Sequence, residues 1–149
     1  MQTALDRLNQ WITEVPVKFN GLSEQEVSRR PQPHKWSRKE ILGHLCDSAL
    51  NNLQRFVRAQ YEEQPNTIIQ YDQDQWGRLM NYQELPFEHI LSFWVSLNKQ
   101  VAAVWRRISE GQLQNVFLLN EGKMVTLHWL IDDYVDHMEH HLDQIFGSN

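Results

Sequence analysis

The stretch Asp136-His137-Met138-Glu139-His140-His141-Leu142-Asp143-Gln144-Ile145 decides how the rest of this chain is interpreted. At 100° per residue it predicts an amphipathic helix, because apolar side chains recur on one face. The residues of that face are Leu127, Ile131, Tyr134, Met138, Leu142 and Ile145. His137 and His141 stand four residues apart, which places their Cβ atoms roughly 5–6 Å from one another. His141 falls inside the edge of the apolar face and His137 falls beside it.

This histidine pair has two interpretations. Buried imidazoles need polar partners, and two of them one turn apart are close enough to share a metal ion. A histidine pair also arises by chance on helices, and a single buried histidine commonly bonds a neighbouring carbonyl. A third ligand elsewhere in the chain would favour the metal site.

Composition limits the class of protein. A length of 149 residues with 41% apolar residues predicts one domain, residues 1–149, with a substantial core. A net charge of −5 without a run of Lys or Arg argues against nucleic acid as a partner. The one cysteine, Cys46, excludes an intramolecular disulfide framework and is typical of a reducing compartment. There is no signal-peptide pattern and no apolar run of the roughly 18 residues that span a membrane, so we expect a cytoplasmic protein that does not interact with membranes.

The first segment predicts a helix with one buried face, formed by Leu5, Leu8, Ile12 and Val15. Pro16 should end or kink this helix. Ser23 followed by Glu26 fits a capping box at the start of a short helix. The two prolines in residues 29–34 indicate an extended linker.

Ser37 is expected to begin the second long helix, since Ser37 and Glu40 form another capping-box pattern. Apolar residues follow at helical spacing: Ile41, Leu42, Leu45, Ala49, Leu53 and Phe56. His44 lies at the edge of this apolar face, on a polar strip shared with Ser48, Asn51 and Arg55. Its position alone therefore indicates a surface histidine.

The helix should fade in residues 62–65, and a connection of about 20 residues follows, which is longer than ordinary helix–helix loops. It is polar with scattered aromatic residues, and residues 72–80 could form a short helix. Long connections of this kind are often functional, so a lid over a site and plain surface packing both fit the pattern.

Residues 86–111 predict the third helix, with Pro86 in its first turn and Gly111 at its end. Residues 115–125 predict a small hairpin around Asn120-Glu121-Gly122. Thr126 should cap the last helix, which runs to about Phe146 and stops at Gly147. Four long helices with two short connections and one long crossover predict an all-α protein, a four-helix bundle.

Three segments now resemble a known family. The segment Lys35-Trp36-Ser37-x-Lys39-Glu40-Ile41-Leu42-Gly43-His44-Leu45-Cys46-Asp47-Ser48 is similar to the second helix of the DinB-like four-helix bundles. The segment Tyr71-Asp72-x-x-x-Trp76 and the C-terminal Thr126-Leu127 with His137-x3-His141-x3-Ile145 match in the same order. Together they cover residues 35–146. The YfiT-type group, provisionally named metal-dependent hydrolases, is the part of the family that the chain resembles.

The resemblance implies a divalent metal held by His44, His137 and His141. Three protein ligands leave a position for water or substrate, as in catalytic sites. Histidine ligation suits zinc or nickel without selecting between them. Asp47, one turn after His44, could orient a metal-ligating histidine by accepting a hydrogen bond from its second ring nitrogen. It could also be a solvated carboxylate. Cys46 lies on a different side of its helix from His44, so we expect it to be neither a metal ligand nor a nucleophile.

Three functions remain open for such a site. Metal-activated water would hydrolyse a small-molecule substrate. Metal coordination also deprotonates thiols, and the wider family resembles transferases that use bacillithiol or mycothiol. A non-catalytic, stress-related metal-binding protein is the third. Helix faces with more apolar residues than one seam requires, together with the pairing of relatives, lead us to expect a homodimer.

Overall fold

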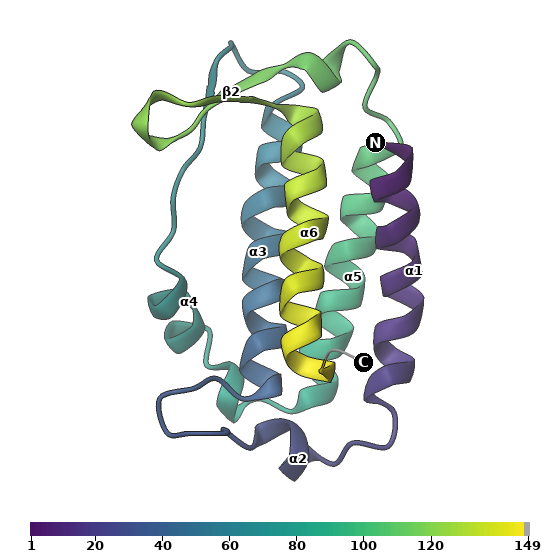
Figure 1. Ribbon diagram of the computed structural model, residues 1–149, viewed down its shortest axis with the longest axis vertical. Coiled ribbons are helices and arrows are strands. Elements are labelled where there is room, and N and C mark those ends of the chain that lie inside the picture. The colour runs from purple at the N-terminus through teal and green to yellow at the C-terminus, as the bar shows by residue number, and fades with distance from the viewer. Residues whose placement is uncertain (148–149) are drawn as a thin grey trace.

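The computed structural model describes residues 1–147 and is built on four long helices (Figure 1). They are α1 (Gln2–Phe19), α3 (Arg38–Arg58), α5 (Phe87–Trp105) and α6 (Leu127–Phe146). Helices α1 and α6 run in one direction, and α3 and α5 run in the other (Figure 1). Helix α1 packs against α5 and α6, α6 packs against α1 and α3, and α3 packs most extensively against α5. The predicted four-helix bundle is therefore confirmed.

The three connections between these helices all carry structure of their own. Residues 20–37 include α2 (Glu24–Ser28), and residues 59–86 include β1 (Asn66–Thr67), α4 (Gln73–Leu79) and the 3-10 helix η1 (Tyr82–Glu84). Residues 106–126 include η2 (Gln112–Gln114), β2 (Val116–Leu118), η3 (Asn120–Gly122) and β3 (Met124–Thr126). The expected long crossover is present, because α3 and α5 are parallel neighbours. The expectation of two short connections is wrong.

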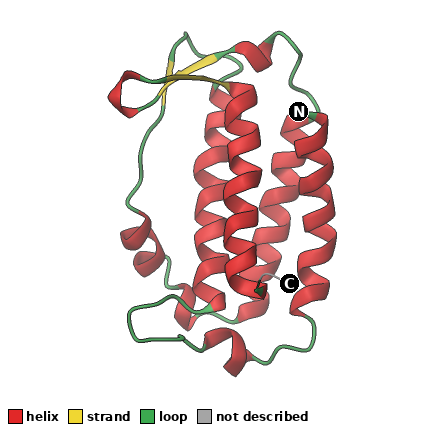
Figure 2. Ribbon diagram, viewed as in Figure 1, coloured by secondary structure: helices red, strands yellow, loops and turns green. Residues whose placement is uncertain are grey.

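The strands form one small sheet at an end of the bundle (Figure 2). Strands β2 and β3 pair antiparallel, with Phe117 opposite Val125, and so confirm the predicted hairpin. Strand β1 adds a parallel neighbour to β2, with Asn66 opposite Phe117. A strand of two residues carries no alternation of polar and apolar side chains, so the sequence pattern did not indicate it.

Most helix boundaries follow the capping residues. The side chains of Ser23 and Ser37 both form capping boxes, and Thr126 accepts a hydrogen bond from the Trp129 backbone N–H. Two expected stops are wrong. Pro16 lies inside α1, which continues to Phe19 because that ring is buried in the core. Helix α5 ends at Trp105 rather than at Gly111, which precedes η2.

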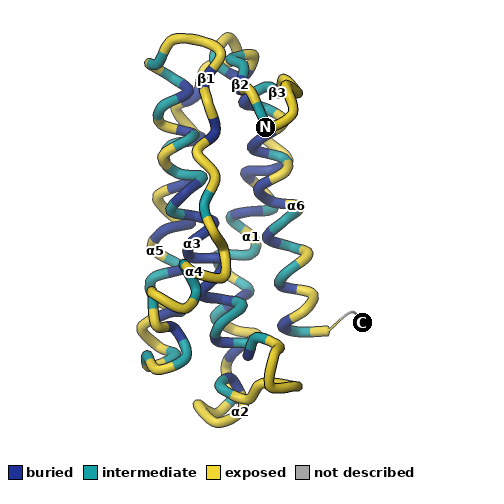
Figure 3. The backbone as a smooth tube through the Cα atoms, turned by 90° about the vertical axis from the view of Figure 1, so that its left-hand side faces the viewer, coloured by how far each residue is buried: buried dark blue, intermediate teal, exposed yellow. Residues whose placement is uncertain are grey.

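The core fills the space between the four helices, where buried positions line their inner faces (Figure 3). Trp94 and Trp105 are both completely buried, in agreement with a structural role for the apolar face of α5. Within residues 1–147, none of the helices combines the length and apolar character needed to cross a lipid bilayer.

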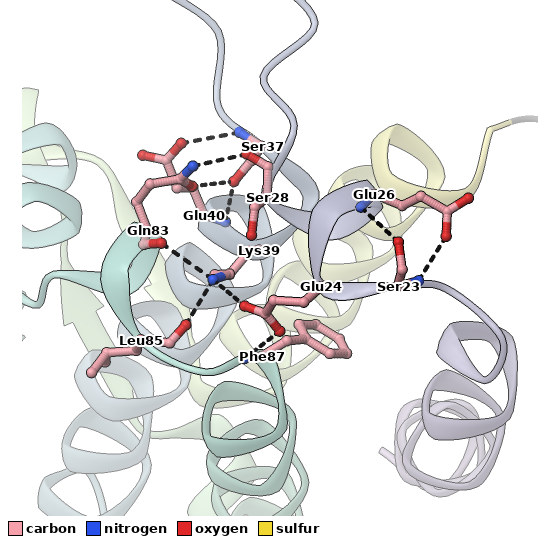
Figure 4. Close-up of polar contacts among 10 residues, drawn as sticks. All are labelled: Ser23, Glu24, Glu26, Ser28, Ser37, Lys39, Glu40, Gln83, Leu85 and Phe87. Carbon is pink, nitrogen blue, oxygen red and sulfur yellow. Dashed lines mark hydrogen bonds and ion pairs between the residues drawn. The ribbon is translucent and has the colours of Figure 1, made fainter.

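A buried lysine joins the crossover to the base of the bundle (Figure 4). Lys39 is only 3% exposed, and its Nζ donates to Glu24 Oε1 at 2.5 Å, to the Leu85 carbonyl at 2.7 Å and to the Gln83 carbonyl at 3.2 Å. All three ammonium donors thus have partners. The other oxygen of Glu24 accepts the Phe87 backbone N–H at 3.2 Å. These contacts fix η1 against α3, which positions Tyr82 beside the site described next.

Candidate metal centre

His44 on α3 and His137 and His141 on α6 converge between the two helices. His137 Nε2 lies 3.5 Å from His44 Nε2 and 3.2 Å from His141 Nε2. One ring nitrogen from each of the three residues lies within 4.8 Å of the others. The structure therefore brings together all three residues that the sequence and the resemblance pointed to.

The geometry of these nitrogens fits a shared cation. In a tetrahedral site with Zn–N bonds of about 2.0–2.1 Å, neighbouring ligand nitrogens lie about 3.3–3.4 Å apart, close to the distances of 3.2 and 3.5 Å found here. A hydrogen bond explains the arrangement less well, because one N–H of His137 cannot point at two other Nε2 atoms at once. The donor set therefore fits a divalent metal with an open position.

The electrostatics of the site also favour metal binding. Burial lowers the pKa of His44 from 6.5 to about 3, with smaller contributions from His141 and His137. Burial likewise lowers the pKa of His137 to about 4, and it lowers the pKa of His141. The imidazoles are therefore neutral at pH 7, which is the form that coordinates a metal.

Two neighbours orient the rings. His141 Nδ1 donates to Gln144 Oε1 at 2.8 Å, which leaves the lone pair on the Nε2 that faces the other histidines. The indole of Trp36 packs on His44, with ring centroids 5.1 Å apart. His44 is 1% exposed, so its expected surface position is wrong. The sequence pattern placed His44 at the edge of the apolar face of its own helix, but α6 and Trp36 cover that edge in the structure.

Asp47 is fully buried, so the solvated-carboxylate interpretation is wrong. Its Oδ1 accepts a 2.6 Å hydrogen bond from the Tyr82 hydroxyl, and its Oδ2 has no hydrogen-bond partner within residues 1–147. No hydrogen bond joins it to His44 among the described contacts. The Tyr82 ring reaches Asp47 by crossing α3 at Gly43, where an added Cβ would lie 2.3 Å from the ring.

The other candidate residues are engaged elsewhere. Glu139 accepts hydrogen bonds from Arg7 and from the Trp11 indole, away from the site. His140 Nε2 lies 3.3 Å from Gln144 Nε2, at the rim. Cys46 is buried with its sulfur 3.7 Å from the Ile90 carbonyl, which agrees with its exclusion as a ligand.

A cavity of about 270 Å³ adjoins the histidines on one side, with His137 in its wall. Helices α3 and α6, the crossover and the hairpin end all contribute to it. The polar residues of its lining include Ser48, Asn52, Arg55, Tyr71 and Asp133. The crossover descends along the outside of α3 (Figure 3), and this places residues 68–73 in the wall of the cavity. Of the two earlier interpretations of this connection, a cover over a site is the one that this placement favours.

Sequence reasoning missed Gln144 and Tyr82. Gln144 stands three residues after His141, a spacing at which helical side chains meet, so that contact could have been anticipated. Tyr82 comes from the far end of the crossover, and no local pattern places it against Asp47.

Comparisons with known proteins find similar sequences that span most of this chain. A protein of Halalkalibacterium halodurans is 26% identical over 145 residues, which covers 93% of this chain and 84% of the relative. YfiT of Bacillus subtilis is 28% identical over 145 residues, covering 94% and 81%. Both carry the provisional name metal-dependent hydrolase.

Solved structures show the same fold. The structure of YfiT, described as having an unusual four-helix bundle topology, matches with a TM-score of 0.85 at 21% identity, covering 97% of this chain and 82% of that one. A mycothiol-dependent maleylpyruvate isomerase matches with a TM-score of 0.71 at 15% identity, covering 99% and 60%. The family model described as DinB superfamily matches residues 4–145. This chain therefore belongs to the DinB superfamily.

Proposed function

We propose that this protein is a metal-dependent hydrolase in which His44, His137 and His141 hold one divalent metal, zinc or nickel. The observation that carries the proposal is the convergence of three neutral Nε2 atoms at 3.2 and 3.5 Å beside a cavity. Three protein ligands leave a coordination position for water or substrate. The provisional name shared by the relatives supports the same activity.

The bound metal would supply Lewis acidity and a water whose pKa is lowered toward 7. The protein residues divide the remaining work. Gln144 fixes the ring of His141, and Trp36 covers His44 from the side of the linker. The cavity next to His137 accepts the substrate and keeps its reacting group close to the three histidines.

The test is a panel of small esters and amides assayed with zinc-supplied and nickel-supplied protein in the absence of thiols. We expect metal-dependent turnover that His141→Ala abolishes and His128→Ala retains. His128 is a matched control, because it lies on the same helix but contacts the Met1 amino group instead of the site. Equal turnover in both variants would contradict the proposal.

A thiol-dependent transferase is the second candidate. The observation that favours it is the fold shared with a mycothiol-dependent isomerase. Turnover that requires bacillithiol, mycothiol or glutathione would select this candidate. Tight metal binding without turnover in either assay would select a non-catalytic, stress-related role.

We further propose that the protein is cytoplasmic and forms a homodimer. Apolar side chains are exposed around the hairpin end of the bundle, with Trp129 40% and Met124 49% exposed, and exposed apolar clusters often mark interfaces. Light scattering at micromolar concentration should give twice the chain mass of 17.8 kDa. A monomeric mass would contradict this assembly.

A further inference from the structure

The cavity beside His137 contains a guanidinium that forms no close ion pair with an acidic residue among residues 1–147. Arg55 lies in its wall, and no Asp or Glu among residues 1–147 forms an ion pair with it. Its Nη2 donates to the Ile69 carbonyl at 2.9 Å, and its Nη1 donates to Asn52 Oδ1 at 3.3 Å. Its Nε is buried and has no partner. Two of the five guanidinium N–H groups are therefore used.

A half-buried guanidinium N–H without a protein partner is destabilising unless a water molecule or a ligand accepts a hydrogen bond from it. Burial lowers the pKa of Arg55 from its ordinary value, but an arginine side chain stays charged in proteins. Two contacts hold it in place: it donates to Asn52 on the preceding turn of α3 and to the crossover carbonyl of Ile69. The group is thus a fixed, charged donor that faces a cavity.

The opposite wall limits the charge that the cavity tolerates. Asp133 on α6 lines the same cavity, and it attracts Arg55 at longer range without forming a close ion pair with it. The guanidinium of Arg55 attracts a ligand's first negative charge, whereas a second negative charge closer to Asp133 is repelled. The volume of about 270 Å³ also restricts the ligand to a small molecule.

We propose that Arg55 binds the carboxylate of a small monoanionic substrate whose reacting end lies at His137, and that Asp133 discriminates against dianions. This inference rests on the proposed function in one respect, which is that the substrate reacts at the three histidines. Arginine is suited to the role, because its planar fork pairs with a carboxylate through two parallel hydrogen bonds. In this arrangement the carboxylate positions the substrate, and Arg55 takes no part in the chemical step.

The test uses the full-length, chelator-treated protein, so that its result does not depend on metal. Butyrate and 1-butanol serve as probes, and the Arg55 Nε–H signal and the backbone amides of Ser48 and Asn52 are followed by NMR. We expect butyrate to shift these signals saturably in the millimolar range and butanol to leave them unchanged. Succinate, the dianionic probe, should bind more weakly than butyrate, and Asp133→Asn should reduce that difference.

Arg55→Gln should weaken butyrate binding roughly tenfold or more, because a charge-assisted pair is lost. Arg107→Gln, which replaces an exposed arginine outside the cavity, should bind as the wild type does. Should Arg55→Gln fail to fold, Arg55→Lys keeps the charge and should retain weakened butyrate binding. Unchanged binding in Arg55→Gln, equal binding of butanol, or no saturable shift in the wild type would overturn the proposal. If the metal-dependent turnover assays failed, the NMR shifts with butyrate would still be expected. Failure of the proposed function can therefore be told apart from failure of the Arg55 proposal.

Discussion

The hydroxyl of Tyr82 donates a 2.6 Å hydrogen bond to Oδ1 of Asp47, and this bond ties the end of the crossover to the helix turn that follows His44. It stabilises an otherwise unpaired carboxylate inside the bundle, since Asp47 is fully buried. Asp47 thereby becomes a titratable element of the fold beside the candidate metal centre.

Asp47→Asn should gain stability relative to the wild type as the pH rises. Burial raises the pKa of Asp47 from 3.8 to about 6, opposed by the Tyr82 bond. The protonated Asp47 side chain therefore contributes its full share to the free energy of unfolding below about pH 3.8. This contribution is lost as the pH rises through 6. A shift of this size corresponds to a change on the order of 3 kcal/mol. Urea unfolding of both proteins at pH 4 and 7 measures the difference, and a value independent of pH would contradict it.

Gly43→Ala should destabilise the protein by about 1–3 kcal/mol, the usual range for overpacking. The added Cβ would lie 2.3 Å from the Tyr82 ring, which must move away from α3 and from Asp47. Gly77→Ala in α4 is the matched control, because nothing lies within 4 Å of its added Cβ. That variant should be neutral or gain up to about 1 kcal/mol of helix propensity. Thermal unfolding of both variants checks the contrast, and equal melting temperatures would refute it.

The metal-free protein should lose stability as the pH falls below about 6.5. Burial lowers the pKa of His44 to about 3 and that of His137 to about 4, so between these values and 6.5 the unfolded chain takes up protons that the folded chain does not. The measurement belongs in the Asp47→Asn background, where the opposite dependence of Asp47 is removed. His44→Ala in that background should show a smaller loss between pH 6.5 and 4. An identical pH profile would show that His44 is not buried in its neutral form.

Metal should stabilise the bundle without being required for folding. The core of four helices is formed by apolar residues that need no ligand, unlike a zinc finger. Chelator-treated protein should keep its helical circular dichroism and a cooperative transition, and its melting temperature should rise with zinc or nickel concentration. Absence of cooperative unfolding after chelation would contradict this expectation.

The sequence predicted the bundle because its helices have clear apolar faces and its caps are explicit, as at Ser37 and Thr126. It failed where tertiary contacts override local rules. Pro16 sits inside α1 because the burial of Phe19 extends the helix beyond it. The direction of the helices and the pairing of β1 with β2 depend on packing that periodicity does not encode.

The site divides in the same way. The pair His137 and His141 follows from helical spacing alone. His44 was recovered only through the resemblance, because a helical wheel describes one helix and cannot include the neighbour that covers it. The position of Arg55 in the cavity wall could be found only from the structure, because the polar strip of α3 that indicated solvent exposure in the sequence includes Ser48 and Arg55, which line the cavity together with crossover residues.

The measurement that tests the central claim most directly is the metal content of single alanine variants after dialysis against zinc or nickel. The wild type should keep one metal per chain, and His44→Ala, His137→Ala and His141→Ala should each lose it. His34→Ala, His128→Ala and His140→Ala should keep it, because these residues lie outside the group of three. Full stoichiometry in His44→Ala together with loss in His140→Ala would contradict the assignment. A wild type that binds no metal would contradict the site itself.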